Sequence, residues 1–256
     1  MNIKRYVANV LTLTEFELRK LKHDSSQIWL RSVQPALWLL VFGEVFTKIR
    51  AIPTEGFSYL QFMTPGVLAQ SVMFVAIFYG ISVVWERDLG LLNKLLSTPA
   101  SRSAIVVGKA LSAGVRGVFQ AVTVLALALL LRVKLTLTPF GVLGVFGVIV
   151  LFGMCFSSFS MCLAPVFRTR ERMMGIGQAI TMPIFFASNA IYPISLMPGW
   201  LKAIASFNPL SYVVDVLRAL LVTRNFSRVP ADLCAVVAAT AVLVTLASLS
   251  FRKIIS

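Results

Sequence analysis

Few ionisable side chains interrupt the long apolar stretches of this chain, and their spacing limits the chemistry open to it. Asp215 and Arg218 are three residues apart, so a helix would bring them together as an ion pair. Glu44 could contact a cationic substrate or pair with a base on another helix; the alternative is a place at the outer headgroup level near Lys48. The sequence holds no carboxylate pair, no nucleotide-binding glycine loop and no metal-ligand cluster. We therefore expect no catalytic residue, no metal site and no cofactor in this chain.

Two further basic residues lie at the start of an apolar segment. Lys109 and Arg116 are seven positions apart and so share one face of a helix. The simplest expectation is that both long side chains extend to lipid phosphates; the alternative is a role in lipid or drug entry.

Composition indicates an integral membrane protein. Of the 256 residues, 58% are hydrophobic and 13% are charged, and the mean hydropathy is +0.85, well above the level of a soluble domain. A helix crosses a bilayer in roughly 20 residues. The apolar stretches therefore predict a single all-α transmembrane domain over 1–256 with six spans, at about 30–49, 60–84, 106–131, 139–163, 173–192 and 231–251.

The net charge of +14 comes from basic residues in short loops beside apolar segments, a pattern that insertion into a membrane alone produces. We expect membrane lipids as partners and no nucleic acid. Lysine and arginine are more frequent in the connections that share a side with the N-terminus. By the positive-inside rule both termini are cytoplasmic.

A polar, helix-prone segment over about 86–99 separates the second and third spans. Its leucines recur at helical spacing with charged residues between them, which predicts an amphipathic helix of about three turns, ended by Thr98 and Pro99. A helix fixed between two spans can transmit a push to both. Its candidate contact residues for a cytoplasmic partner are Glu86, Arg87, Asp88, Leu92, Leu95, Leu96, Pro99 and Arg102.

Two more segments have a membrane-surface pattern. Residues 9–24 suit a helix in the inner headgroup layer, either as part of a partner's docking site or as a simple anchor. Residues 193–221 are apolar but divided by prolines into pieces too short to cross a bilayer, which predicts re-entrant or interfacial helices on the outer side. The candidate residues of this outer segment are Pro193, Pro198, Trp200, Asn208, Pro209, Asp215 and Arg218.

The chain resembles the ABC-2 type transporter permeases, the membrane subunits of bacterial ATP-driven exporters. The run from Trp85 to Gly90, the run from Leu95 to Pro99, Arg102 and the pair Gly108-Lys109 are similar to the cytoplasmic loop of that family. The outer segment, from Tyr192-Pro193 to Asp215 and Arg218, is similar to the stretch before its last span. Within the family the likeness is greatest to the daunorubicin-resistance and multidrug branch, and the polysaccharide and nodulation-factor branches stay open.

The resemblance implies a multi-pass protein of the bacterial cytoplasmic membrane in which residues 86–99 form the coupling helix. It implies a dimer of permeases, here a homodimer, bound to two copies of a separate ATPase that holds ATP and Mg²⁺. We expect an exporter of an amphiphilic, drug-like or lipid-like molecule, with a polysaccharide or lipo-oligosaccharide as the alternative cargo. Possible pathway residues are Glu44, Gln70 and Ser71. A membrane-embedded lipid-modifying enzyme and an ion-gradient-driven transporter are alternatives of other classes.

Overall fold

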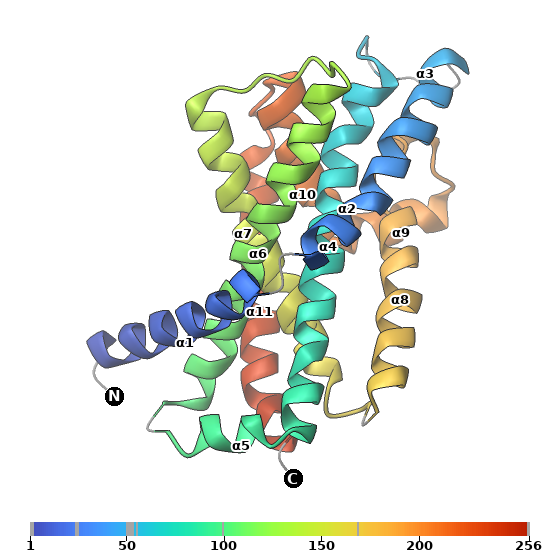
Figure 1. Cartoon of the computed structure of the whole chain (residues 1–256). Coiled ribbons are helices and arrows are strands. Elements are labelled where there is room, and N and C mark those ends of the chain that lie inside the picture. Colours follow the sequence, from blue (N-terminus) through green and yellow to red (C-terminus); the bar gives the residue numbers. More distant parts are fainter. Residues whose placement is uncertain are drawn as a thin grey trace.

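The computed structural model describes residues 3–23, 26–49, 54, 56–98, 100–167 and 169–254, and over these ranges the protein consists of helices and connecting turns without a strand (Figure 1). Within these described ranges, four helices are long and apolar enough to cross a membrane. They are α4 (Tyr59–Asp88), α6 (Arg102–Leu130), α7 (Pro139–Leu163) and α11 (Val229–Ile254). The predicted all-helical membrane fold is confirmed to this extent.

The other helical elements are shorter, and two of them are π-helical and one is a 3-10 helix. They are α1 (Ile3–His23), α2 (Ser26–Leu37), the π-helix η1 (Trp38–Gly43), α3 (Glu44–Ile49), α5 (Leu91–Leu96), α8 (Arg170–Phe186), the 3-10 helix η2 (Ile194–Leu196), α9 (Gly199–Phe207), α10 (Pro209–Arg218) and the π-helix η3 (Ala219–Thr223).

Two of the six predicted spans have no single long helix. The first corresponds to α2, η1 and α3, which follow one another without a gap over 26–49. The fifth corresponds to α8, which ends at Phe186 rather than near residue 192. In the outer segment, α9 and the continuous pair α10–η3 are bent by 80° and together could form a fifth span. The number of six spans therefore stays a prediction.

Side-chain caps fix where three of the long helices begin. The Ser58 hydroxyl accepts from the Gln61 N–H, and the Gln61 side chain accepts from the Ser58 N–H, which forms a capping box for α4. The hydroxyl of Ser101 accepts from the Ala104 N–H at the start of α6, and Thr138 caps α7 in the same way. These caps satisfy N–H groups that have no partner inside the helix.

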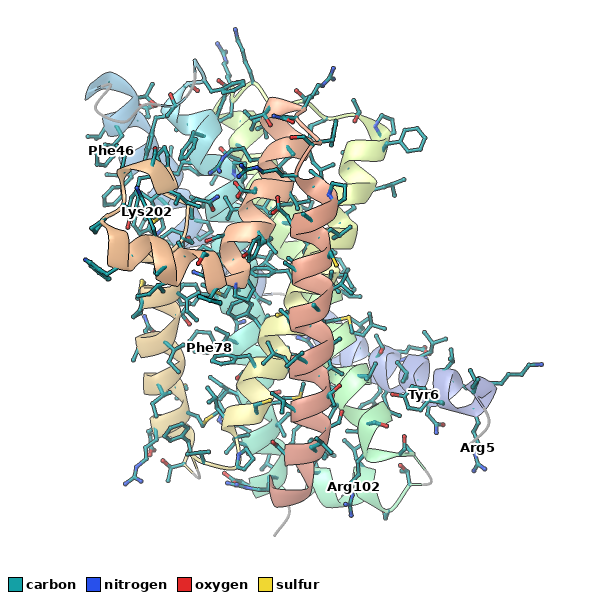
Figure 2. The ribbon with its side chains drawn as sticks, turned by 180° about the vertical axis from the view of Figure 1, so that it is seen from behind. Arg5, Tyr6, Phe46, Phe78, Arg102 and Lys202 are labelled. Atoms are coloured by element: carbon teal, nitrogen blue, oxygen red, sulfur yellow. The ribbon has the colours of Figure 1, made fainter. Side chains whose placement is uncertain are left out.

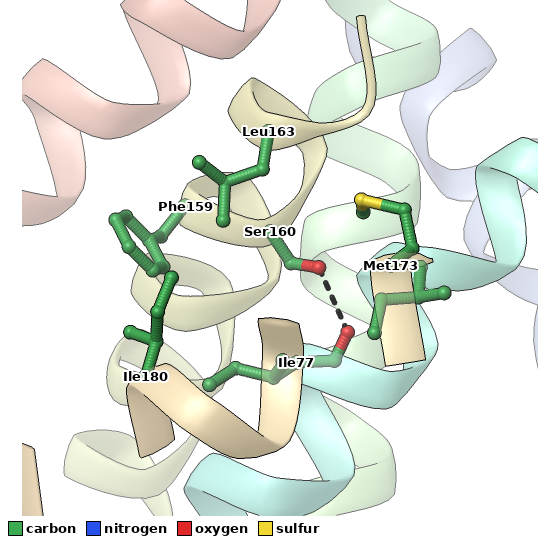
Figure 3. Close-up of a pocket in the computed structure, with 8 residues that line it drawn as sticks. Ile77, Phe159, Ser160, Leu163, Met173 and Ile180 are labelled. Carbon is green, nitrogen blue, oxygen red and sulfur yellow. Dashed lines mark hydrogen bonds between the residues drawn. The ribbon is translucent and has the colours of Figure 1, made fainter. Parts of the chain in front are cut away.

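The bundle is built around α4. In its most apolar stretch 78% of the residues are buried, against 17% in α11, so α4 is central and α11 presents most of its surface outward. α6, α7 and α8 all pack on α4. Figure 3 shows one such contact, where the Ser160 hydroxyl of α7 donates to the Ile77 carbonyl of α4 at 2.9 Å, between Met173 and Ile180 of α8.

α1 leaves the bundle sideways and crosses α6 (Figure 1). A Cβ atom at Gly108 of α6 would lie 2.9 Å from the Leu13 Cβ of α1, so glycine permits the close approach. At the same place the Thr14 hydroxyl donates to the Gly108 carbonyl at 3.2 Å. This crossing brings polar side chains of α1 against the ends of α4 and α6.

Candidate functional site

The connection from α4 to α6 contains a turn and one short helix instead of the longer helix predicted over 86–99. α4 continues through Asp88, and α5 begins only at Leu91. Between them Gly90 has a φ of +69°, a left-handed conformation that glycine adopts without the steric cost of a Cβ. The connection lies at one end of the bundle together with the end of α11 (Figure 1).

This turn has a buried side and an exposed side. Leu92 is fully buried and Leu95 packs against the core, whereas Leu89 is 74% exposed. Pro99 and the side chain of Leu96 lie outside the part of the protein that the structure describes. Leu89 is thus exposed at the tip of the turn, and Leu92 and Leu95 join the turn to the bundle.

A cluster of four charged side chains from three helices lies beside the turn. Its members are Glu17 and Lys20 of α1, Glu86 of α4 and Lys109 of α6. The Lys109 Nζ lies 2.7 Å from Oε1 of Glu17 and 2.5 Å from Oε2 of Glu86. The Lys20 Nζ contacts the second oxygen of each carboxylate, at 3.0 and 3.1 Å. Because each carboxylate faces two ammonium groups, the four charges compensate one another where water is largely excluded.

Three polar side chains extend this charged cluster into the bundle. The Tyr79 hydroxyl donates to Oε2 of Glu17 at 2.6 Å and accepts from the Ser112 hydroxyl at 3.0 Å. Arg116 donates through Nη2 to the Glu17 backbone carbonyl at 2.6 Å, and its guanidinium lies 4.4 Å from the centre of the Tyr79 ring. The end of α1 is therefore fixed to α4 and α6 by several directional contacts.

Charge pairing dominates the ionisation of the α1 members of the cluster. Burial alone raises the pKa of Glu17, but the charges of Lys109 and Lys20 and the hydrogen bonds from Lys109 and Tyr79 outweigh it and lower the pKa to about 2. Burial alone lowers the pKa of Lys20, and the carboxylates of Glu86 and Glu17 raise it above its ordinary value. Both groups are charged at neutral pH.

A second polar group lies in the outer segment. Asp215 and Arg218 form the predicted ion pair, with Nη1 3.2 Å from Oδ1. The Asn189 side-chain amide donates to the same Oδ1 at 2.6 Å, and Arg218 donates to the Asn189 carbonyl at 2.8 Å. The Arg218 guanidinium also lies 4.0 Å from the centre of the Phe62 ring of α4. These contacts fasten α10 to α4 and to the turn after α8.

Asn208 joins α8 to α10. Its side-chain oxygen accepts from the Leu210 N–H and caps α10, with Pro209 in the first turn. Its side-chain amide donates to the carbonyls of Ile184 and Ala187 at 2.7 and 2.8 Å. These carbonyls belong to the last turn of α8, so Asn208 satisfies acceptors that the helix end leaves open.

Of the remaining candidates of the outer segment, Pro193 lines a pocket together with Asp215 and Arg218, and Trp200 lies on a separate apolar groove. Pro198 precedes α9 and Pro193 precedes η2. Trp200 of α9 is 67% exposed. It lines a groove of about 850 Å³ with residues from the end of α8.

Comparison with known proteins decides which family has this arrangement. The ABC-2 type transporter family matches residues 8–222, which include the charged cluster, the α4–α5 turn and the outer segment. The chain belongs to this family. The family resemblance predicted from the sequence is confirmed.

Several relatives share this ABC-2 domain. The daunorubicin resistance ABC transporter permease protein DrrB1 of Streptomyces coeruleorubidus is 30% identical over 91% of this chain and 82% of its own length. A protein named as the transport permease ycf38, of Cyanophora paradoxa, is 31% identical over 73% of this chain and 65% of its own length. YbhR of Escherichia coli, named as a multidrug ABC transporter permease, is 28% identical over 62% of this chain and 43% of its own length. The matched part of this chain thus spans about two thirds of the Cyanophora relative.

Membership of the ABC-2 family has direct consequences. The predicted location, as a multi-pass protein of the bacterial cytoplasmic membrane, is confirmed. The relatives are transport permeases, and ABC-2 permeases function with ATPase subunits.

The expectation that the side chains of Lys109 and Arg116 extend to lipid phosphates is wrong. Lys109 is 2% exposed and paired with two carboxylates rather than extended to lipid phosphates, and Arg116 bonds to α1. Glu86, which the sequence placed among the partner-contact residues, is 8% exposed and points into the charged cluster. Sequence reasoning also missed Glu17. The local sequence indicates its role only in that a carboxylate lies within an amphipathic helical pattern.

The three possible pathway residues do not come together. Gln70 and Ser71 are buried in α4 and line a cavity between α2, α4 and α8. Glu44 is exposed at the start of α3 and does not line this cavity.

Proposed function

We propose that this chain is the membrane subunit of an ATP-driven exporter that moves an amphiphilic, drug-like or lipid-like molecule across the bacterial cytoplasmic membrane. The observation that carries the proposal is the family match over residues 8–222. The names of DrrB1 and YbhR support a drug-like or similar amphiphilic cargo. ATP and Mg²⁺ bind to a separate ATPase, present in two copies on a homodimer of permeases.

In this proposal the subunit has six spans and cytoplasmic termini. α2, η1 and α3 together form the first span, and their unbroken run over 26–49 supports this. α8 forms most of the fifth span. The turn that follows α8 completes this span, and Asn208 holds the turn through the carbonyls of Ile184 and Ala187. α1 lies in the inner headgroup layer, and α9 and α10 form the outer re-entrant element.

The α4–α5 turn is the proposed contact with the ATPase. Leu89 is 74% exposed, and the side chains of Arg87 and Asp88 are 25% and 35% exposed. Arg102, at the start of α6, is exposed at the same end of the bundle (Figure 2). These residues face the partner, while Glu86 faces inward.

The charged cluster couples the α4–α5 turn to several helices, so that a movement of the turn displaces all of them. A displacement of the end of α4 pulls on Glu86, and Lys109 passes that force to α6 because it pairs with Glu86 at 2.5 Å. Lys109 also holds Glu17, so α1 follows. Closure of the ATPase pair would thus shift α1, α4 and α6 together and open the permease pair to the opposite side.

Reconstitution tests the proposal. The purified permease and its ATPase are placed in proteoliposomes, and ATP-dependent movement of a fluorescent amphiphile is recorded. We expect transport with MgATP and none with an ATPase whose phosphate-binding lysine is replaced. Transport that continues without ATP under an imposed ion gradient, or product formation by the permease alone, would contradict it.

A further inference from the structure

A polar pocket lies at the end of α4 opposite the α4–α5 turn. There the chain before α4, the turn after α8, α10 and the start of α11 meet (Figure 1). The pocket has a volume of about 420 Å³, within the range of small-molecule sites. Its charged and amide lining residues include Asn189, Asp215, Arg218, Arg228 and Asp232.

One buried acceptor in the pocket wall has no donor. Asn189 is 3% exposed, and its Oδ1 accepts no hydrogen bond from a described residue. The orientation of this amide is fixed, because its Nδ2 donates to the carboxylate of Asp215, and an ionised carboxylate only accepts. A buried acceptor without a donor costs free energy that an incoming N–H or O–H group would recover. The group missing at Asn189 is thus a hydrogen-bond donor.

Two carboxylates add further acceptors to the same pocket. Asp232, in the first turn of α11, is 9% exposed and accepts no hydrogen bond from a described residue. The described contacts of Asp215 use Oδ1. Its side chain is 41% exposed, so the second oxygen is available to a ligand. Acceptors from the turn after α8, from α10 and from α11 therefore surround one space.

The charges of the described lining residues are balanced. Two carboxylates and two guanidinium groups line the pocket. Arg218 pairs with Asp215, and the charge of Arg228 acts on both carboxylates. A cationic ligand would meet the arginines and an anionic ligand the carboxylates, so the pocket favours neither sign. A hydroxyl group donates one hydrogen and also accepts, without a net charge, so it can satisfy both kinds of lining group.

We propose, on the basis of the exporter function above, that this pocket binds an uncharged headgroup of the cargo that carries several hydroxyls, such as a glycosyl group. Its hydroxyls donate to Asn189 Oδ1 and to the carboxylate of Asp232, and the exposed Arg228 donates to a ligand oxygen. The half-buried Phe57 provides an apolar wall for the C–H face of a sugar ring. Because α10 and α11 both contribute, the bound headgroup joins the outer segment to the last helix.

Binding of matched probes tests this assignment. Three probes carry the same NBD-labelled dodecyl chain and end in a glucosyl, a trimethylammonium or a sulfate group. The permease is purified in a detergent without a sugar headgroup and measured by fluorescence in nanodiscs of phosphatidylcholine, with empty nanodiscs subtracted. We expect the glucosyl probe to bind at least about tenfold more tightly than either charged probe. Equal or tighter binding of a charged probe to the wild type would overturn the proposal, and this measurement needs no variant.

Charge-removing variants give a readout that general damage to the fold would not produce. Asp232→Ala should weaken the glucosyl probe at least about tenfold and tighten the sulfate probe, because the arginines are then in excess. Arg228→Gln should weaken the glucosyl probe and tighten the trimethylammonium probe. Glu171→Ala is the matched control, since Glu171 is also an acidic residue in the first turn of a helix but is exposed and does not line the pocket. Unchanged glucosyl binding in a folded Asp232→Ala protein would overturn the proposal.

The same probes distinguish this inference from the exporter function. ATP-driven transport of all three probes, with no glucosyl preference in binding, would leave the exporter in place and refute the pocket. A glucosyl preference in binding, with no ATP-driven transport of any probe, would retain the pocket and refute the exporter. Transport of the charged probes alone, with the glucosyl probe bound but retained, would refute the assignment of the headgroup to the cargo and identify the ligand as a resident lipid.

Discussion

At the scale of single residues, the charged cluster shows how a lysine is kept inside an apolar bundle. Lys109 has two carboxylate partners, and both of these also face Lys20. Removing one member of a buried pair leaves a charge without compensation, which costs far more than loss of an exposed pair. The Glu15–Arg19 pair on α1, with side chains 64% and 77% exposed, provides the comparison within the same helix.

Lys109→Met is expected to destabilise the protein by about 3–5 kcal/mol, because Glu17 and Glu86 lose their buried counterion. Thermal unfolding in detergent, followed by tryptophan fluorescence, measures the loss. The control Arg19→Met should cost no more than about 1 kcal/mol. The triple variant that also carries Glu17→Gln and Glu86→Gln should recover part of the loss; if it is no more stable than Lys109→Met, charge compensation is not the cause.

Acid should weaken the contact between α1 and the bundle. The pKa of Glu17 is about 2 in the folded protein against an ordinary value of 4.5, so the unfolded state takes up a proton first as pH falls. The contribution of Glu17 to stability is therefore complete above its ordinary pKa and is lost as pH falls from about 4.5 towards 2. Melting temperatures measured from neutral pH to about pH 3 should fall more steeply for the wild type than for Glu17→Gln. Parallel curves would show that Glu17 contributes nothing to the acid sensitivity.

At the scale of elements, the short turn after α4 has separate residues for attachment and for contact. Leu92 and Leu95 attach it to the core, and Leu89 remains exposed. Gly90 sets the direction of the chain between them through its positive φ. A change at Leu89 can thus alter the surface of the turn without disturbing its attachment.

Leu89→Glu should reduce recovery of the ATPase with the affinity-tagged permease at least about tenfold, because it puts a charge in the proposed apolar contact. The permease itself should remain folded. Leu130→Glu is the matched control, since Leu130 is 80% exposed at the other end of α6. Equal recovery of the ATPase with the Leu89→Glu and wild-type permeases would exclude the turn from the interface.

At the scale of the whole molecule, the connections between the long helices gather at two opposite ends of the bundle (Figure 1). The α4–α5 turn and the end of α11 lie at one end, and the α6–α7 connection lies at the other (Figure 1). With an even number of spans, both termini and the turn face the same compartment. This gives a topology that can be checked chemically.

Cysteine labelling checks it in intact cells, after the native Cys155, Cys162 and Cys234 have been replaced. A membrane-impermeant maleimide should label Lys134→Cys and Lys202→Cys from outside. Lys94→Cys should be labelled only after the membrane is made permeable. Labelling of Lys94→Cys in intact cells would reverse the orientation, and mixed labelling of the two outer positions would contradict six spans.

The sequence predicted what depends on local pattern and missed what depends on distant contacts. The long apolar runs predicted α4, α6, α7 and α11, and the spacing of Asp215 and Arg218 predicted their ion pair. Glu17 and Lys109 are 92 positions apart, so nothing in the local pattern indicates that they meet. The break in the predicted helix at Gly90 could have been foreseen from the sequence, because an isolated glycine inside a helical pattern destabilises the helix. The location of the cavity at Gln70 depends on how α2 and α8 pack, which a single sequence does not encode locally.

The charged cluster divides into two electrically neutral halves. Glu17 and Lys20 belong to α1 and lie 3.0 Å apart, while Glu86 and Lys109 belong to the bundle and lie 2.5 Å apart. If α1 swings away, each half retains a complete ion pair, and neither the helix nor the bundle is left with a net charge from the cluster. The separation then costs hydrogen bonds and packing but no isolated ion. Detachment of α1 from the bundle therefore lacks the large electrostatic barrier that splitting an ordinary buried salt bridge would impose.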